Sequence, residues 1–347
     1  MTMKRLSPFL LIWTICLLAA CSADGNAPAG ASQASHNASQ PAVDLPGRLL
    51  YVRNKQIWMH EGKGEHSLQF TGEVRDPAWS ADGKRIAFVR RDESFSDLYV
   101  LNMETGETSQ VTSNDSQIQK RTQQYVHDVT WAAKPAWSPD GQTIVFLGQK
   151  KPGTWEGQQP SLYEFPLTLY QYKTNLIGTR RPTNDDILGV DQQNSDVLSP
   201  AWSPDGRYLA YVQAPRDENP RRIMLYDFQS AQAKPYPGIP DGAYDPAWSP
   251  DGRRLAFAVN QDSSTDIWVV EGTDGGTPQR LTKVGRARSP AWSPDGSMIA
   301  FVNVADDGTN VFTLSPKQQN GRLEVGDAVQ VTGDGDIDAT AGLSWGK

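Results

Sequence analysis

Cysteine and histidine are scarce in this chain, which has 2 Cys and 4 His among 347 residues. Both cysteines, Cys16 and Cys21, lie near the N-terminus, so the rest of the chain has no thiol for a disulfide, a nucleophile or a thiolate metal site. Beyond residue 46 the histidines are His60, His66 and His127, and the last is far from the other two in sequence. We therefore expect no bound metal and no cofactor.

Other signatures of catalysis are missing as well. The sequence contains no Gly-x-Ser-x-Gly elbow and no phosphate-binding glycine loop. The formal net charge of −7 argues against nucleic acid or an anionic lipid surface as the main partner. We expect no set of catalytic residues, and hence a protein that is not an enzyme.

The N-terminus carries a short apolar run after two basic residues. Lys4 and Arg5 precede "FLLIWTICLLAA", which predicts a secretory signal peptide over residues 1–20 and is too short to indicate a membrane span. The ending "LAAC" resembles the lipobox of bacterial lipoproteins, which implies cleavage before Cys21 and lipidation of that residue. Ser22 in the next position favours the outer membrane. An ordinary signal peptide is the alternative.

Residues 21–46 form a segment of different composition. It is rich in Ala, Ser, Gln, Asn, Pro and Gly and has almost no large apolar residue, so it cannot bury enough surface to fold. This composition predicts a flexible tether with a root-mean-square reach of roughly 25–30 Å. Together with the lipid anchor it predicts a periplasmic body held near its membrane.

A pattern of the type "DPAWSPDGRRLAF" recurs through the rest of the chain. Its five tryptophans are separated by 58, 65, 46 and 44 residues, and the shorter steps match a four-stranded propeller blade of about 40–45 residues. The five copies begin at Asp76, Lys134, Ser199, Asp245 and Ser289.

Each copy can be divided into strands. "PAW" predicts a first strand, "SPDG" a tight turn, and the following apolar run a second strand packed between blades. A third, alternating run and a fourth ending in Thr complete the unit. We expect the Asp residues of these turns to stabilise the turns and not to form a metal ring, and the tryptophans to pack between blades.

The two ends of the repeat region are complementary. Residues 49–71 contain strands two to four without a first strand, whereas "GLSWGK" around Trp345 is a first strand with nothing after it. Pairing them predicts an all-β domain over residues 47–347: a six-bladed β-propeller of four-stranded antiparallel blades, closed by its own termini. An open six-unit array is the alternative. "DGDIDATAG" from Asp334 resembles a calcium loop, but Ala339 replaces its glycine, so we expect no calcium.

The "PAWSPDG" units resemble those of the TolB-like propeller family, and the likeness covers residues 47–347. Related repeats occur in prolyl-oligopeptidase-type peptidases, which need a second, catalytic domain for which this chain leaves no residues. The TolB resemblance implies a role in envelope integrity and in assemblies of the Tol–Pal type. A shared fold does not by itself imply a shared function.

Three insertions interrupt the repeat, at residues 113–133, 148–160 and 179–197. Antiparallel connectivity places all three on one face of the disc, around the third blade, where loops on a rigid scaffold commonly bind partners. They carry aromatic and Arg residues typical of binding hot spots, together with polar residues. The candidate partner-binding residues are Tyr125, His127, Asp128, Trp131, Trp155, Arg180, Arg181, Asp185 and Asp186.

Three functional hypotheses follow. The first is a non-enzymatic, membrane-anchored propeller that binds another envelope protein. The second is a protein that binds carbohydrate or peptidoglycan fragments through the patch or the channel. The third is a lyase or hydrolase whose site lies in the channel. The alternative explanation of the insertions is that they are loops that vary within the family and bind no partner.

Overall fold

The computed structural model divides the chain into two units, residues 1–40 and 41–347. The signal peptide, Cys21 and nearly all of the tether predicted from sequence lie outside the described residues. The structure describes residues 43–347 apart from residues 121, 123–124, 126–127, 150–166, 174–178, 191–194, 217–218 and 320–321.

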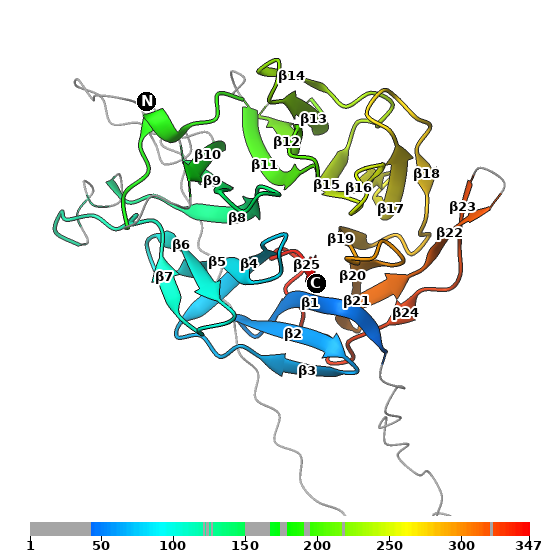
Figure 1. Ribbon diagram of the computed structural model, residues 1–347, viewed down its shortest axis with the longest axis horizontal. Coiled ribbons are helices and arrows are strands. Elements are labelled where there is room, and N and C mark those ends of the chain that lie inside the picture. Colours follow the sequence, from blue (N-terminus) through cyan, green and yellow to red (C-terminus); the bar gives the residue numbers. More distant parts are fainter. Residues whose placement is uncertain are drawn as a thin grey trace, which may run out of the picture. The chain divides into compact units, whose positions relative to one another are not determined.

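The second unit is a ring of antiparallel sheets arranged around a common centre (Figure 1). In each sheet the innermost strand carries the repeated tryptophan. Blades I and II are β25(Ser344–Gly346)-β1(Leu45–Arg53)-β2(Gln56–Gly62)-β3(Gly64–Ser67) and β4(Glu73–Trp79)-β5(Arg85–Arg91)-β6(Ser96–Asn102)-β7(Thr108–Gln110). Blades III and IV are β8(Ala132–Trp137)-β9(Thr143–Gln149)-β10(Leu167–Lys173) and β11(Ser195–Trp202)-β12(Tyr208–Pro215)-β13(Arg222–Asp227)-β14(Gln232–Pro235). Blades V and VI are β15(Ala243–Trp248)-β16(Arg254–Gln261)-β17(Ser264–Glu271)-β18(Gln279–Arg280) and β19(Ala287–Trp292)-β20(Ile299–Ala305)-β21(Gly308–Leu314)-β24(Val329–Gln330).

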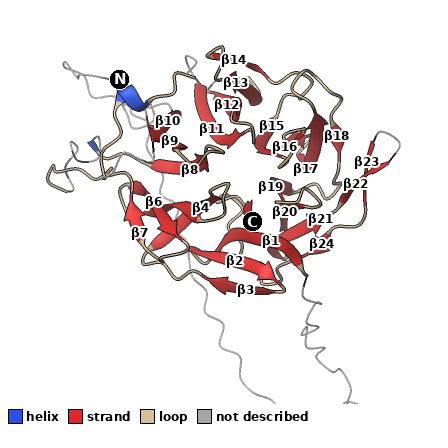
Figure 2. Cartoon of the chain, in the orientation of Figure 1, coloured by secondary structure: helices blue, strands red, loops and turns tan. Residues whose placement is uncertain are grey.

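Two features depart from the regular unit. Blade III has three strands among the described residues, and Tyr170 of β10 forms an isolated antiparallel bridge with Ile187 on its outer side. After blade VI's third strand, β22 (Pro316–Gln319) and β23 (Arg322–Val325) form a separate hairpin. Strands dominate the chain (Figure 2), and no helix in its described part has the length and apolar character needed to cross a membrane.

The first and last strands of the second unit close the ring. In blade I the C-terminal strand β25 pairs antiparallel with β1, so that Leu49 faces Trp345 and Leu50 faces Ser344. The Trp345 indole donates a hydrogen bond of 2.7 Å to the carbonyl of Pro46. This confirms the predicted six-bladed propeller closed by both termini; β1 begins at Leu45, two residues before the predicted domain start.

The repeated "SPDG" segments form the turns between first and second strands. In blade V the Ser249 hydroxyl donates to Asp251 Oδ1 at 2.6 Å, and the same oxygen accepts the Arg253 amide at 3.0 Å. Gly252 has φ 70°, which a glycine adopts without steric cost. The predicted turn-forming role of the repeated Asp is therefore confirmed.

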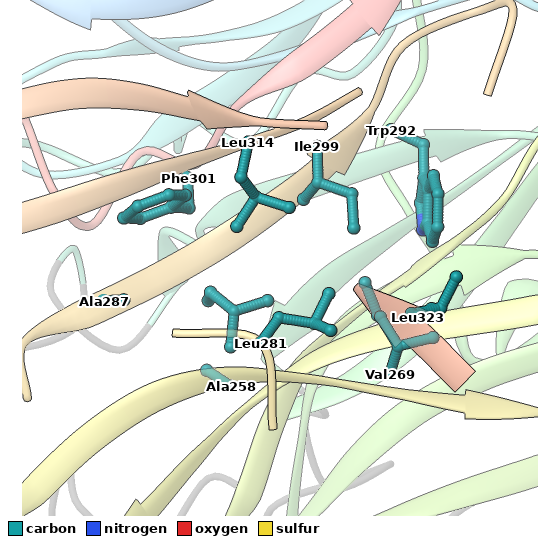
Figure 3. Packing of buried hydrophobic residues seen from close by; sticks show 11 residues of the cluster. Ala258, Val269, Leu281, Ala287, Trp292, Ile299, Phe301, Leu314 and Leu323 are labelled. Atoms are coloured by element: carbon teal, nitrogen blue, oxygen red, sulfur yellow. The ribbon is translucent and has the colours of Figure 1, made fainter. Parts of the chain in front are cut away.

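The repeated tryptophans lie between blades. The Trp137 indole donates to the carbonyl of Ala78 in blade II at 3.1 Å, and that of Trp248 donates to Ala201 in blade IV at 3.2 Å. Figure 3 shows the corresponding core between blades V and VI, where Trp292 lies among buried aliphatic residues of both sheets. Apolar burial between neighbouring blades thus stabilises the ring, as the repeat predicted.

Candidate functional site

Backbone conformation sets apart one position in every repeat. The residue immediately before "PAW" has φ between 46° and 52° in five blades, and Gly342 occupies the matching position in blade I with φ 80°. A β-bulge interrupts the first-strand pairing at this point in blades II to VI. Positive φ is costly for non-glycine residues and is often found at functional sites. The six residues are Asp76, Lys134, Ser199, Asp245, Ser289 and Gly342.

These six residues line the central channel and are called the bulge ring below. Asp245 accepts the hydroxyls of Ser199 at 2.9 Å and Ser289 at 3.1 Å, so one carboxylate connects blades IV, V and VI. Asp76 accepts the Lys134 amide at 3.2 Å, and the Lys134 ammonium lies 3.2 Å from its other oxygen. The ring therefore satisfies most of its own polar groups across blade boundaries.

A cavity of about 590 Å³ opens on one side of the bulge ring and is called the channel mouth below. Its wall includes Trp131 and Ala132 from the first insertion, so it adjoins the face that carries the insertions. A smaller cavity of about 120 Å³, bordered by the prolines of the repeats, lies next to the same ring. The channel mouth has the size of a small-ligand site.

The first and third insertions are joined to one another. The Arg181 guanidinium forms an ion pair of 3.1 Å with Asp128, and the Ser113 amide donates to the Arg180 carbonyl at 3.0 Å. Thr112 and Arg180 also form a parallel bridge. Two loops that flank blade III thus form one continuous surface beside the channel mouth.

Arg180 is held within this surface. Its guanidinium lies 4.1 Å from the centre of the Tyr172 ring and binds both oxygens of Asp186, at 2.5 and 2.7 Å. Burial by itself would raise the pKa of Asp186, but the hydrogen bonds from Arg180 and Thr183 outweigh it and hold that pKa below its ordinary value. The Arg180–Asp186 ion pair therefore holds two parts of the third insertion together.

The remaining candidate residues differ in accessibility. Tyr125 is only 3% exposed, and its hydroxyl donates to Asp115 at 2.9 Å, so its side chain supports the loop and is not accessible to a partner. Trp131 is half-buried and Asp185 is exposed. His127 and Trp155 lie outside the described residues.

The acidic segment from Asp334, which resembles a calcium loop in sequence, forms ion pairs with an arginine of the same chain. Asp334 and Asp336 lie 2.9 and 3.3 Å from the guanidinium of Arg53, which is 4% exposed. Among the described residues, no group of three or more His, Cys, Asp or Glu side chains is arranged to hold a metal ion.

Sequence reasoning missed the bulge ring and the basic residues around it. The repeats are nearly identical from Pro to Gly, yet the residue before Pro is Asp, Lys, Ser, Asp and Ser in successive copies. The variation of the residue before Pro, in a repeat that is otherwise uniform, is the sequence signal that could have identified the bulge ring. The positive φ could not be inferred, because a residue before Pro usually prefers an extended conformation.

Family comparisons agree with this architecture. Residues 184–342 match the family described as "TolB beta propeller domain", and residues 50–153 match the "Dipeptidyl peptidase IV (DPP IV) N-terminal region". A closed ring of six such blades defines the class as a six-bladed β-propeller. Within that class the chain is similar to the TolB propellers, which confirms the resemblance seen in its repeats.

Two curated proteins are similar over part of the chain. A "Protein TolB homolog" of Protochlamydia amoebophila is 26% identical over 202 residues, 55% of this chain and 37% of that protein. The "Uncharacterized peptidase YuxL" of Bacillus subtilis is 27% identical over 175 residues, 45% of this chain and 24% of that protein. The chain therefore matches well under half of the length of either relative.

Among solved structures, TolB from Acinetobacter baumannii superimposes with a TM-score of 0.59 at 20% identity, covering 87% of this chain and 67% of the other. The putative TolB from Agrobacterium tumefaciens gives a TM-score of 0.57 at 18% identity, covering 87% and 94% of the two chains. These likenesses establish the fold.

Proposed function

We propose that this protein is a lipid-anchored periplasmic scaffold that binds another envelope protein through the surface formed by its first and third insertions. The observation that carries the proposal is the Arg181–Asp128 ion pair, which joins two loops from either side of blade III. A pre-ordered loop surface lowers the entropy cost of association. The TolB-like fold supports a scaffold role, and the N-terminal sequence supports the anchor.

We further propose that the protein acts without catalysis. His60 and His66 are the only histidines in the described part of the chain, and no Ser side chain hydrogen-bonds to either of them there. The His60 imidazole instead contacts the carbonyls of Val43 and Gly62 at 3.0 and 3.2 Å. A nucleophile without an adjacent base is weak.

A peptidase-related role is the second candidate, and the matches to the dipeptidyl peptidase IV N-terminal region and to the Bacillus peptidase favour it. The first match covers residues 50–153 of this chain, and the second covers 24% of the Bacillus protein. If this role holds, the purified chain should cleave peptides, or should associate with a protein that does. The identity of the partner captured in the experiment below shows whether the chain associates with a peptidase.

Arg181→Ala is expected to weaken capture of the envelope partner by more than about 1 kcal/mol, the loss typical of a truncated hot-spot arginine. Arg181 is half-exposed and lies on the loop surface. Crosslinking in intact envelopes, followed by quantification of the recovered partner, measures the loss, and the melting temperature of each variant reports folding.

Two control variants distinguish direct contact between Arg181 and the partner from a role of Arg181 in holding the two loops together. Asp128→Asn breaks the same ion pair but leaves the guanidinium in place. If Arg181 contacts the partner directly, Asp128→Asn should retain more capture than Arg181→Ala. Asp251→Ala, in a turn on the opposite face, should lower stability and leave capture unchanged. Loss of capture only in Asp251→Ala would place the binding face on the other side of the disc.

Cys21→Ser is expected to release the protein from the membrane or to leave the signal peptide uncleaved, because it removes the sulfur that would carry the lipid. Two or more acyl chains give stable anchoring, whereas one chain binds only marginally. Fractionation of cells that express the variant, with detection of signal cleavage by mass, measures the outcome. A processed variant that stays on the membrane would refute the lipid anchor.

A further inference from the structure

The channel mouth is basic, although the chain as a whole carries a net charge of −7. Two acidic residues line it, Asp76 and Asp245, and both belong to the bulge ring. Five of its other lining residues are cationic, and all the rest are uncharged. The cationic residues are Arg75, Arg91, Lys134, Arg221 and Arg288.

The two acids are engaged with groups at the base of the cavity. Asp245 accepts two serine hydroxyls, as described above. Asp76 is 2% exposed and lies 3.2 Å from the Lys134 ammonium and 3.3 Å from Arg75 Nε. Lys134 and Arg75 therefore share one internal carboxylate, which offsets part of their positive charge. The other three arginines add positive charge that this carboxylate does not offset.

These three arginines have little compensation. Arg221 and Arg288 form no ion pair in the described part of the chain. Arg91 lies 3.7 Å from Glu73 and 5.2 Å from the centre of the Trp131 ring, which leaves its guanidinium near the cavity wall. Like charges that share a concave, partly desolvated space raise the local concentration of anions.

The three guanidinium groups come from alternate blades around the ring. Arg91 ends β5 in blade II, Arg221 immediately precedes β13 in blade IV, and Arg288 lies in β19 of blade VI. A ligand with a single carboxylate can bind one of these guanidinium groups at a time. A ligand with several carboxylates can bind guanidinium groups that point into the cavity from different blades. Arginine binds carboxylates through paired, charge-assisted hydrogen bonds.

We propose that the channel mouth binds an organic anion carrying two or three carboxylates, held by Arg91, Arg221 and Arg288. Asn260 and Thr265, which also line the cavity, supply uncharged hydrogen-bonding groups. The carboxylates come either from a free small acid or from acidic side chains of a protein segment. The site is separate from the Arg181 surface, so it stands even if partner capture through that surface fails.

The test is calorimetric titration of the purified full-length chain with citrate and with acetate at constant ionic strength. Citrate should bind with one-to-one stoichiometry and acetate should not bind measurably. Arg221→Ala and Arg288→Ala should each weaken citrate binding at least about tenfold, the loss that corresponds to one charge-assisted hydrogen-bonded contact. Arg222→Ala is the matched control, because Arg222 pairs with Asp241 and does not line the cavity.

A hexaglutamate peptide, titrated in parallel, distinguishes the two sources. Tighter binding of citrate identifies a free small acid, and tighter binding of the peptide identifies an acidic protein segment; both results support the site if they depend on Arg221 and Arg288. The melting temperature of each variant excludes unfolding as the cause. Failure of both probes to bind, equal binding of citrate and acetate, or an equal loss in Arg222→Ala would overturn the proposal.

Discussion

Removal of residues 342–347 is expected to lower the melting temperature by roughly 8 °C, because about 5 kcal/mol of stabilisation is lost from a domain of roughly 300 residues. The deletion removes β25, its pairing with β1, and the Trp345 indole hydrogen bond to Pro46. It also exposes Leu49 and Leu50, which are fully buried in the intact ring. Burial of each large apolar side chain contributes about 1.5–3 kcal/mol.

The effect is larger than that of an ordinary tail trim because the strand also holds the neighbouring blade. The Trp79 amide of blade II donates to Ser344 Oγ at 2.9 Å, and a side chain at Gly346 would collide with the Trp79 ring. Trp345→Phe is the control: it keeps an aromatic ring and loses one hydrogen bond, for a cost of about 1 kcal/mol. An unchanged melting temperature after the deletion would contradict ring closure by the termini.

The fold was predictable because its determinants are local and repeated. Turn chemistry in "SPDG" and the apolar second strand are readable within one unit, and five copies of that unit specify the blades. The closing blade was predictable because each terminus lacked what the other supplied. Neither inference required knowledge of which side chains meet across the ring.

The site could be predicted only in part, because its geometry depends on contacts between distant segments. Connectivity predicted that the insertions share a face, and the Arg181–Asp128 pair joins two of them. Burial of Tyr125 could not be inferred, since it depends on contacts within the first insertion, where its hydroxyl donates to Asp115. The meeting of Arg91, Arg221 and Arg288 in one cavity likewise follows from ring closure and from no local motif.

The segment at Asp334 illustrates the same limit. Its alternating carboxylates resemble a metal loop in sequence, but the ring places a guanidinium beside them, contributed by a strand about 280 residues earlier. The Arg53 side chain also pairs with Glu65 at 2.8 Å, and Glu65 accepts a hydrogen bond from the buried hydroxyl of Tyr51. This network joins blade I to the loop that follows blade VI.

Arg53→Met is expected to destabilise the domain by about 3 kcal/mol, because removing one partner of a buried ionic network leaves its carboxylates without compensation. The side chain of Arg53 is 5% exposed, whereas those of Asp334 and Asp336 are 61% and 36% exposed, which keeps the expected cost at the lower end. Chemical denaturation of both proteins at pH 7 measures the difference. Lys55→Met, which removes a side chain that is 72% exposed in its ion pair with Glu73, should cost less than about 1 kcal/mol.

The pH dependence of that difference tests whether charge is the cause. Burial alone would raise the pKa of Glu65, but hydrogen bonds from Arg53 and Tyr51 outweigh it and hold the pKa below its ordinary value of 4.5. A lowered folded-state pKa stabilises the fold at pH values above 4.5, and this contribution is lost as the pH falls through the folded-state value. Arg53→Met lacks the interaction responsible, so its disadvantage should shrink as the pH falls below 4.5. A difference that stays constant from neutral to acidic pH would show that Arg53 stabilises the blade junction by packing and not by its charge.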